Sequence, residues 1–278
     1  MSNDTTLVLG ATGKTGRRVA ARLRLHGTQV RTASRSSRTR FDWLDPDGWD
    51  PVLQDITTAY VVPPPVPGPA HELVARAEAV GVRRLVLLSG HGMGDWGDST
   101  FGREMRSAED AVRASALEWT VLRPSNFNQN FDEDLFHAPL VAGELALPAG
   151  SVPEPFIDLE DVADVAAAVL TEPGRHAGRT YELTGPRALT FAEAVDLISR
   201  SSGLPITYRQ VSPAEYTAML VAQGWGREDA RNVTDMFVLM ERGVIAEPTD
   251  GVETVLGRAP RTFEDYVLRV AAAGAWRP

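Results

Sequence analysis

The chain has 278 residues, of which 43% are hydrophobic and 23% are charged, and it contains no cysteine. These values are typical of a globular protein with one large domain, or with one domain and a smaller lobe folded against it. Without cysteine the chain can form no disulfide, thiolate nucleophile or thiolate metal site. Any redox chemistry must therefore be carried by a bound cofactor.

The net charge of −9 is distributed unevenly. Residues 1–40 hold nine Lys or Arg and one acidic residue, Asp4, so their balance is +8 and that of the remainder is −17. The positive balance of residues 1–40 favours a small anion near the N-terminal region. The negative balance of the remainder argues against a nucleic acid as the partner. The sequence has neither a basic segment followed by a long apolar run nor an apolar stretch of about 18 residues. We therefore expect a cytoplasmic protein that does not contact a membrane.

The stretch GATGKTG at 10–16 follows a predicted strand, TTLVL at 5–9, and suggests two kinds of phosphate site. Its Gly-Lys-Thr is found in P-loops, but a P-loop also needs a glycine about five residues before the glycine of that triplet. That position is Val8, inside the predicted strand. The P-loop interpretation therefore fails at its first residue.

The spaced glycines fit a dinucleotide-binding turn instead. Gly10 permits the tight turn, Gly13 lets the backbone approach a pyrophosphate, and Gly16 lets the following helix lie close to the sheet. That helix has one apolar face, its arginines are expected to face water, and Gly27 ends it. A pyrophosphate at its N-terminus is the prediction, and a structural turn without a ligand is the alternative. The cofactor contacts expected here are Gly10, Thr12, Gly13, Lys14, Thr15 and Gly16.

The second predicted strand, TQVRTA at 28–33, is followed by the basic segment SRSSRTR at 34–40. An NAD-binding protein places Asp or Glu at this point to bind the ribose hydroxyls, but this chain has Arg35. Its guanidinium, with the hydroxyls of Ser34 and Ser36, can bind a 2′-phosphate through charge-assisted hydrogen bonds. The segment therefore predicts NADP(H) as the cofactor, against the alternative of a solvated basic turn.

Short apolar runs alternate with helical patterns along the next hundred residues. This alternation predicts an α/β protein, a Rossmann-like doubly wound parallel sheet that binds its ligands at the carboxyl ends of the strands. The strands are expected at 41–44, 59–62, 83–89 and 118–124, the helices at 71–81 and 102–116, with a short segment around 45–53.

The loops at those carboxyl ends are expected to line the cleft. We predict that residues 42 and 43 lie beside the adenine, that the proline-rich segment 62–69 is a rigid wall, and that the glycine-rich segment 89–99 is a mobile lid. The further cofactor contacts expected here are Asp42, Trp43, Val62, Pro63 and Ser89.

The pattern changes after residue 125. The polar and aromatic stretch SNFNQNF at 125–131 does not suit a core strand and is predicted to form a substrate wall. Capping signatures begin at Asp158, Thr190 and Ser212, and each predicts the start of a helix. Asp158 with Asp161 is accordingly interpreted as a cap rather than as a catalytic carboxylate pair.

Two regions are therefore expected. Residues 1–125 form an NADP-binding Rossmann core, and residues 126–278 form a substrate-side region. The latter has further sheet and helix elements to about residue 185 and a smaller, mostly helical lobe from about 186. Helices over 233–243 and 263–274 are expected to cover the substrate side.

The chain lacks the Tyr-x-x-x-Lys pair through which short-chain dehydrogenases usually act. In that pair the lysine lowers the pKa of the tyrosine so that it can protonate an alkoxide. None of the five tyrosines is followed four residues later by Lys, and the single lysine, Lys14, is expected at the phosphates. Ketone and alcohol chemistry would therefore have no proton donor.

The missing donor restricts the acceptor by its charge. Hydride addition to a ketone makes an oxyanion that must be stabilised or protonated, whereas hydride addition to an iminium cation makes a neutral amine. Quinones and azo compounds come next, because their reduced anions are delocalised or take protons from solvent. We therefore predict an iminium or another conjugated small molecule as the acceptor, with quinones and azo compounds as the alternative.

His91 is the candidate catalytic residue, because it alone among the five histidines falls at the end of a central strand. It could donate a proton or orient a substrate, and the alternative is a plain loop histidine. The other histidines show no metal-ligand spacing, so no metal site is predicted. The expected substrate contacts are His91, Met93, Phe127, Asn130 and Phe131.

Taken together, the motifs resemble a known family. GATGKTG, ASRSS, FDWLD, AYVVPPP, RRLVLLS, EWTVLRPSNFNQNF, LTGPRALTFAEAVDLISR and APRTFEDYV follow one another over nearly the whole chain. In this order they resemble the NmrA-like atypical short-chain dehydrogenases, and within that group the ergot-alkaloid reductases and their bacterial relatives. The resemblance implies NADPH-dependent reduction of an iminium intermediate. Both SGHGMGDWGD and SNFNQN depart from the substrate loops expected of that group.

The same family also includes redox sensors that bind NADP without turnover and act by contacting another protein. A sensor needs no substrate chamber, so the expected pair of aromatic, lid-like loops favours the enzyme.

Overall fold

The computed structural model describes residues 4–64 and 66–277. Residue 65 of the expected proline-rich wall lies outside the described residues. So do residues 1–3 and 278 of the two expected regions.

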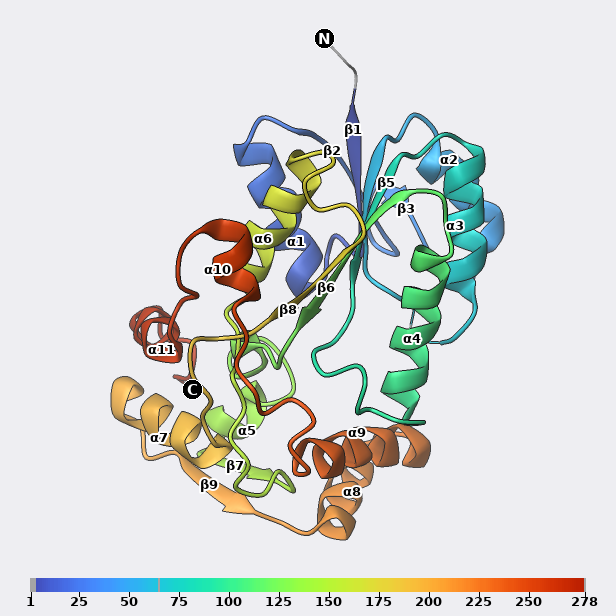
Figure 1. Cartoon of the computed structure of the whole chain (residues 1–278). Helices are drawn as coiled ribbons and strands as arrows, with labels where there is room; N and C mark the ends of the chain where they lie inside the picture. Colours follow the sequence, from blue (N-terminus) through green and yellow to red (C-terminus); the bar gives the residue numbers. More distant parts are fainter. Residues whose placement is uncertain (1–3, 65, 278) are drawn as a thin grey trace.

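The main sheet has seven parallel strands within the described residues, in the order β3-β2-β1-β4-β5-β6-β8 (Figure 1). The order reverses at β1, which pairs with β2 on one side and β4 on the other. Such a reversal is where doubly wound sheets bind ligands, and the predicted Rossmann-like fold is confirmed. The strands are β1 (Thr5–Leu9), β2 (Gln29–Ser34), β3 (Thr39–Arg40), β4 (Thr58–Val61), β5 (Arg84–Leu88), β6 (Glu118–Pro124) and β8 (Arg179–Leu183).

Helices cover both faces of this sheet (Figure 1). One face carries α1 (Lys14–Leu25) and α6 (Leu159–Thr171), with α10 (Gly251–Leu256) packed on α6. The other carries α2 (Trp49–Leu53), which follows the short helix η1 (Pro46–Gly48), together with α3 (Pro69–Ala79) and α4 (Thr100–Arg113). A separate hydrophobic cluster fills each of the two layers.

A smaller lobe lies beyond the carboxyl ends of the strands (Figure 1). It has its own hydrophobic cluster and a two-stranded parallel sheet of β7 and β9, which we did not predict because these strands are short and β9 is largely exposed. Since α6 and β8 return to the main sheet, the chain after residue 125 contributes to both parts. The lobe elements are η2 (Asn128–Asn130), α5 (His137–Val141), β7 (Glu144–Leu147), α7 (Phe191–Ser202), β9 (Thr207–Gln210), α8 (Pro213–Ala222), α9 (Arg227–Met240) and α11 (Phe263–Ala272).

The predicted strand at 41–44 is wrong. Only the two residues of β3, before this run, pair with β2. Phe41 is instead buried, with its ring stacked at 5.8 Å on that of Trp49, and Trp43 meets both rings edge-on. The apolar character of the run therefore reflects an aromatic cluster at the end of the sheet.

The predicted helix caps are present with one difference. Thr190 and Glu193 form a reciprocal capping box, and the Ser212 hydroxyl accepts from the backbone N–H of Glu215. Asp158 also caps its helix, accepting from the backbone N–H of Glu160. Asp161 does not complete a box, because its carboxylate is fully buried and pairs with Arg258 and Arg261.

The arginines of α1 were expected to face water, but two of them join α1 to α6. Arg18 pairs with Glu160 at 3.0 Å, and Arg22 pairs with Glu160 at 2.7 Å and with Asp164 at 2.5 Å. The four side chains in these three ion pairs are only partly exposed, so solvent screens the pairs less than it screens a fully exposed pair.

The position of α1 against the sheet depends on Gly16. A Cβ added to Gly16 would overlap the carbonyl oxygen of Gly10. Gly10 has a φ of +65° and is itself close to β4, since its Cβ would lie 3.1 Å from the Val62 side chain. The two glycines therefore let the loop after β1, the start of α1 and the end of β4 meet closely.

Gly16→Ala is expected to lower the free energy of unfolding by about 2 kcal/mol, because the added methyl overlaps backbone rather than a movable side chain. Alanine otherwise stabilises a helix interior by about 1 kcal/mol relative to glycine, so a loss identifies the close contact. Urea denaturation measures it. Gly94→Ala is the control, since a Cβ there meets no atom within 4 Å. Equal stability of Gly16→Ala and the parent chain would contradict this prediction.

Candidate functional site

The turn after β1 presents the N-terminus of α1 to a cleft. The backbone N–H of Gly13 donates to the carbonyl of Gly10 at 2.9 Å, which closes the turn. Gly13 is the N-cap residue, it carries no capping side chain, and the first turn of α1 holds no acidic residue. The positive end of the helix is therefore available to an anion, as a dinucleotide pyrophosphate requires.

The cleft beside this turn, called here the glycine-turn cleft, has a volume of about 840 Å³. It is lined by most of the predicted cofactor contacts: Gly10, Thr12, Gly13, Lys14, Thr15, Ser34, Arg35, Ser36, Asp42, Trp43, Val62 and Pro63. Gly16 lies behind the turn and Ser89 lines the neighbouring cavity. We did not predict Phe41, Leu44 and Leu88, which complete the lining.

Arg35 is exposed at one end of this cleft, and its guanidinium has no hydrogen bond or ion pair with the described residues. Its neighbour Ser34 is held in place, because its hydroxyl lies 2.7 Å from that of Ser37 and accepts from the backbone N–H of Ser36. An unpaired guanidinium next to a fixed serine turn fits a phosphate monoester.

The same end of the cleft has a fixed aromatic wall. Trp43 is half-buried, and the carbonyl of Asp42 accepts from the indole N–H of Trp49 at 2.7 Å. The Asp42 carboxylate accepts from the backbone N–H of Leu44. Trp43 therefore presents a rigid ring to the cleft, as a planar base requires. These observations together show that the residues present fit a dinucleotide.

A second cavity of about 470 Å³, called here the inner cavity, continues from the glycine-turn cleft. Both are lined by Lys14, Val62, Pro63, Leu88 and Phe127. The other walls include five large aromatic or sulfur-containing side chains: Trp96, Phe101, Met105, Met236 and Met240. The inner cavity therefore offers an apolar chamber at the carboxyl ends of β4, β5 and β6.

Lys14 lies where the two cavities meet, but its ammonium binds the lobe rather than projecting freely toward a phosphate site. It donates to the side-chain oxygen of Asn130 at 2.5 Å, forms an ion pair with Asp134, and lies 5.5 Å from the ring centre of Phe127. Lys14 therefore joins the predicted cofactor turn to two of the predicted substrate residues.

His91 lines the inner cavity, but both of its ring nitrogens are engaged by protein. Nδ1 lies 2.7 Å from a carboxylate oxygen of Glu182, and Nε2 lies 3.2 Å from the backbone carbonyl of Glu247. Arg123 pairs with the other oxygen of Glu182 at 2.9 Å. This arrangement fixes the imidazole and leaves no ring nitrogen free to protonate a substrate, contrary to the proton-donor hypothesis.

The remaining hydroxyl and amide groups that line the inner cavity also form hydrogen bonds within the protein. Ser89 donates to Glu109 at 2.6 Å, and Ser125 donates to the carbonyl of Pro155 at 2.5 Å. Asn130 donates to Asn126. The two amides thus continue a chain of donors that begins at the Lys14 ammonium.

This series of hydrogen bonds, which begins at the Lys14 ammonium, ends at a buried carboxyl group. The Asn126 amide donates to Glu154 at 2.7 Å, and Glu154 is only 1% exposed. Burial raises its pKa to about 8, although the Asn126 hydrogen bond acts in the opposite direction. No sequence pattern around Glu154 indicated that its carboxyl group is buried or that its pKa is raised.

Glu104 is the other polar residue of the inner cavity that the sequence analysis missed. It lies on α4 between Phe101 and Met105, and its carboxylate has no hydrogen bond or ion pair with the described residues. Burial raises its pKa, and the charge of Arg103 acts in the opposite direction. A charged residue on the apolar face of the helix that follows β5 was the available signal.

Two predicted substrate contacts are wrong. Phe131 is fully buried in a cluster with Phe136, Phe156 and Phe263, and Met93 is 3% exposed within the core of the lobe. Neither lines the inner cavity or the glycine-turn cleft, whereas Phe127, Asn130 and His91 do. An aromatic-rich loop gives no indication of which rings turn inward.

The glycine-rich segment 89–99 is anchored, in contrast to the expected mobile lid. The indole N–H of Trp96 donates to the carbonyl of His91 at 2.7 Å, and Trp96 is buried. A Cβ at Gly92, where φ is +70°, would overlap the carbonyl oxygen of Val244. The segment is therefore packed against the chain that follows α9.

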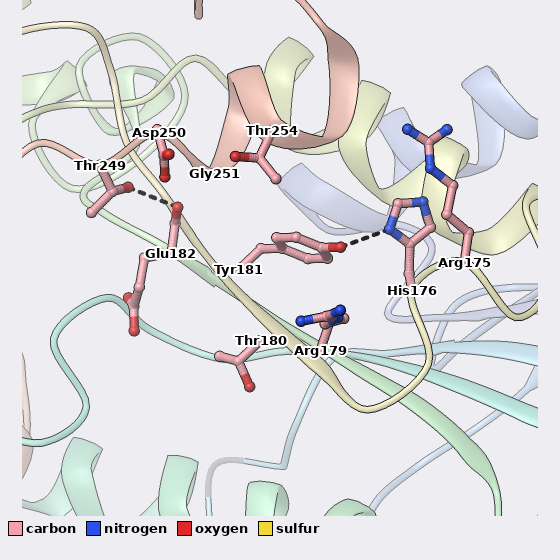
Figure 2. A pocket seen from close by; sticks show the side chains of 10 residues that line it. All are labelled: Arg175, His176, Arg179, Thr180, Tyr181, Glu182, Thr249, Asp250, Gly251 and Thr254. Carbon is pink, nitrogen blue, oxygen red and sulfur yellow. Dashed lines mark hydrogen bonds between the residues drawn. The ribbon is translucent and has the colours of Figure 1, made fainter.

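Other large cavities lie next to the inner cavity and at the edge of the sheet. An outer cavity of about 840 Å³ shares Asn126, Asn130, Met236 and Met240 with the inner one and extends toward α8. An edge cavity of about 610 Å³ runs along the outer edge of β8 and the start of α10 (Figure 2). In Figure 2 the Tyr181 hydroxyl meets His176 Nδ1, a distance of 2.8 Å. The edge cavity has no glycine turn, and we assign it no cofactor.

Comparisons with known proteins agree with this geometry. A family model described as NAD(P)H-binding matches residues 57–173. The chain is 33% identical to a (4-alkanoyl-5-oxo-2,5-dihydrofuran-3-yl)methyl phosphate reductase of Streptomyces griseus, over 97% of this chain and 99% of the relative. It is 31% identical to festuclavine synthase I of Penicillium roqueforti, over 94% and 96% respectively.

Among solved structures, the NADPH complex of the quinone oxidoreductase QOR2 from Escherichia coli superposes with a TM-score of 0.82. The two sequences are 22% identical, and the match covers 96% of this chain and 99% of that one. The chain belongs to the NmrA-like atypical short-chain dehydrogenase/reductases, as its motifs indicated, and it is an NAD(P)H-dependent oxidoreductase. Within residues 4–64 and 66–277, no helix is long and apolar enough to cross a membrane.

The buried Glu154 gives a pH-dependent stability. Its folded pKa of about 8 is raised above the ordinary value of 4.5, so its contribution to stability is complete below 4.5 and is lost as the pH rises through 8. Each unit of difference corresponds to about 1.4 kcal/mol. Glu154→Gln removes the ionisation and keeps an acceptor for Asn126. From pH 5 to pH 8.5, the variant should therefore gain stability relative to the parent chain by several kcal/mol.

Urea denaturation of both proteins at these two pH values measures the difference. A difference in the free energy of unfolding that is the same at pH 5 and pH 8.5 would show that Glu154 does not titrate in this range.

Proposed function

We propose that this protein is an NADPH-dependent reductase that delivers hydride to an iminium ion or another conjugated small molecule, without a proton donor supplied by a tyrosine and lysine pair. The observation that carries the proposal is how the polar groups that line the inner cavity are hydrogen bonded. Its hydroxyl, imidazole, amide and ammonium groups are each hydrogen bonded to other parts of the protein. An acceptor that becomes neutral, or forms a delocalised anion, needs no donor.

The preference for NADP(H) rests on Arg35. Its unpaired guanidinium lies at the end of the glycine-turn cleft beside Ser34 and Ser36, where the 2′-phosphate of the adenosine ribose would be bound. No carboxylate of Asp or Glu takes the corresponding position after β2, since the segment reads SRSSRTR. The expected turn residues Gly10, Gly13 and Thr12 would hold the pyrophosphate.

Bound NADPH would supply the hydride to an acceptor held in the inner cavity. The side chains of the protein would exclude water from the site and hold its walls in a fixed orientation. Phe127 and Leu88 line both the cleft and the cavity, and they exclude water from the boundary between them. The fixed ring of His91 contributes to the end wall, and the donor chain from Lys14 to Glu154 holds Asn130 and Asn126 in one orientation. We assign His91 a positioning role.

The names of the relatives are compatible with this class of acceptor. Festuclavine synthase I is named for the formation of festuclavine, the Streptomyces relative for reduction of an oxo-dihydrofuran, and QOR2 as a quinone oxidoreductase. The inner and outer cavities share four side chains, so an acceptor larger than one ring can be accommodated. Quinones and azo compounds are the second candidates, because they also need no positioned acid.

A panel of acceptors tests the proposal. NADPH oxidation, followed by the loss of absorbance of the reduced nicotinamide, is expected with cyclic iminium ions and with quinones or azo dyes, and not with simple ketones. Ketone reduction at rates equal to those of the conjugated acceptors would contradict the proposal. Tight NADPH binding without turnover of any acceptor would indicate a redox sensor instead.

Arg35→Asp tests the cofactor assignment. The variant places a carboxylate where the 2′-phosphate would lie, so the Kd for NADPH should rise by about a hundredfold, equal to roughly 3 kcal/mol. The Kd for NADH should change by less than about threefold. Arg38→Asp is the control, since Arg38 is exposed in the same segment but does not line the cleft. Equal losses for the two nucleotides in Arg35→Asp would remove Arg35 from the site.

A further inference from the structure

Among the described residues that line the inner cavity, one ionisable side chain has no hydrogen bond or ion pair. Of the ionisable side chains that line it, Lys14 is paired with Asp134, and His91 is paired with Glu182. Glu104 has no such partner among the described residues. The nearest basic side chain along the helix, Arg103, is exposed, and its guanidinium donates to the carbonyl of Asp98 and to Thr100. A single unpaired negative charge therefore faces the chamber.

Several side chains that line the cavity together with Glu104 are apolar or aromatic. Phe101 precedes it by three residues on α4, with its ring 4.8 Å from that of Trp96 in an edge-on arrangement. Met236 and Met240 of α9 line the same cavity. A carboxylate next to such side chains loses part of its hydration without gaining a partner. A positively charged ligand that pairs with the Glu104 carboxylate would therefore be bound favourably.

We propose that Glu104 is a specificity-determining residue, whose carboxylate binds the positive charge of a cationic acceptor and makes this reductase prefer cations to neutral acceptors of the same shape. The proposal rests on the proposed function and deepens it by choosing the iminium class over quinones and azo compounds. The aromatic rings of Trp96, Phe101 and Phe127 add to the selection, because a cation is attracted to their faces.

The charge balance of the reaction is consistent with this role. Hydride adds to the iminium carbon, the π electrons of the C=N bond become the lone pair of the nitrogen, and the product is a neutral amine with no proton transferred. Glu104 neither gains nor loses a proton in this step. Burial raises the pKa of Glu104, although the charge of Arg103 acts in the opposite direction, and a bound cation would favour the ionised carboxylate.

The test uses Glu104→Gln, which keeps the shape and removes the charge. Asp110→Asn is the matched control, because Asp110 is an exposed carboxylate of the same helix that does not line the cavity. Two acceptors of two fused six-membered rings are compared, the N-methyl-3,4-dihydroisoquinolinium cation and neutral 1,4-naphthoquinone. Binding of the N,N-dimethyl-tetrahydroisoquinolinium cation, which cannot accept hydride, is measured by calorimetry without turnover.

Glu104→Gln is expected to raise the KM for the iminium and the Kd for the non-reducible cation by about tenfold, because one partly shielded ion pair is lost. The kcat/KM for the quinone should change by less than about twofold, and Asp110→Asn should resemble the parent chain in every measurement. Thermal denaturation establishes that both variants are folded.

Three results would overturn the role of Glu104: equal loss of activity with both acceptors, a selective loss of quinone reduction, which would identify Glu104 as a proton donor, or unchanged cation binding. Failure of the proposed function is a separate result. In that case the parent chain turns over neither acceptor, and the calorimetric comparison still decides whether Glu104 binds a cation.

Discussion

The contact between Gly16 and the carbonyl of Gly10 is the constraint on which the rest of the site depends. It lets α1 begin directly against the turn after β1 and brings that turn against Val62 at the end of β4. The helix N-terminus therefore points into the crevice at which the strand order reverses, where its partial positive charge is useful to an anion. Once α1 is placed in this way, Lys14 in its first turn reaches Asn130 and Asp134 of the lobe. One close backbone contact thus determines the position of the proposed nucleotide site and of the residue that joins it to the lobe.

The chemistry of the inner cavity follows from how its polar groups are used. Most polar side chains that line it are bound to another part of the protein, and these bonds hold the walls in a single arrangement. Under the proposed function, the chamber would position an acceptor and contribute little acid or base chemistry. Selectivity would then depend on the shape of the chamber and on the charge of Glu104.

The part of the site that could be predicted from the sequence is the part built from neighbouring residues. The turn at 10–16 and the basic segment at 34–40 each follow a strand directly, so local geometry and the strand order were enough to bring them together. The acceptor side could not be predicted in the same way, because Phe101, Phe127 and Met236 come from three separate segments whose meeting depends on the packing of the lobe. Phe131 shows the same limit, since Phe127 and Phe131 lie four residues apart on one loop and only one of them faces a cavity. The charge of Glu104 on the apolar face of α4 was visible in the sequence, but that its carboxylate has no partner among the described residues is known only from the three-dimensional contacts.

The wall formed by Met105, Met236 and Met240 has a consequence for how this scaffold can diversify. Thioether side chains are unbranched and polarizable, so they adapt to ring systems of different outline with little change in energy. Two of the three belong to α9, which with α8 forms a helical pair at the periphery of the lobe. Replacement of α8 and α9 would change which molecules fit the inner cavity. The glycine-turn cleft would be left unchanged. Under the proposed function, one part of the chain would therefore set which acceptors fit, and another part would hold the nucleotide.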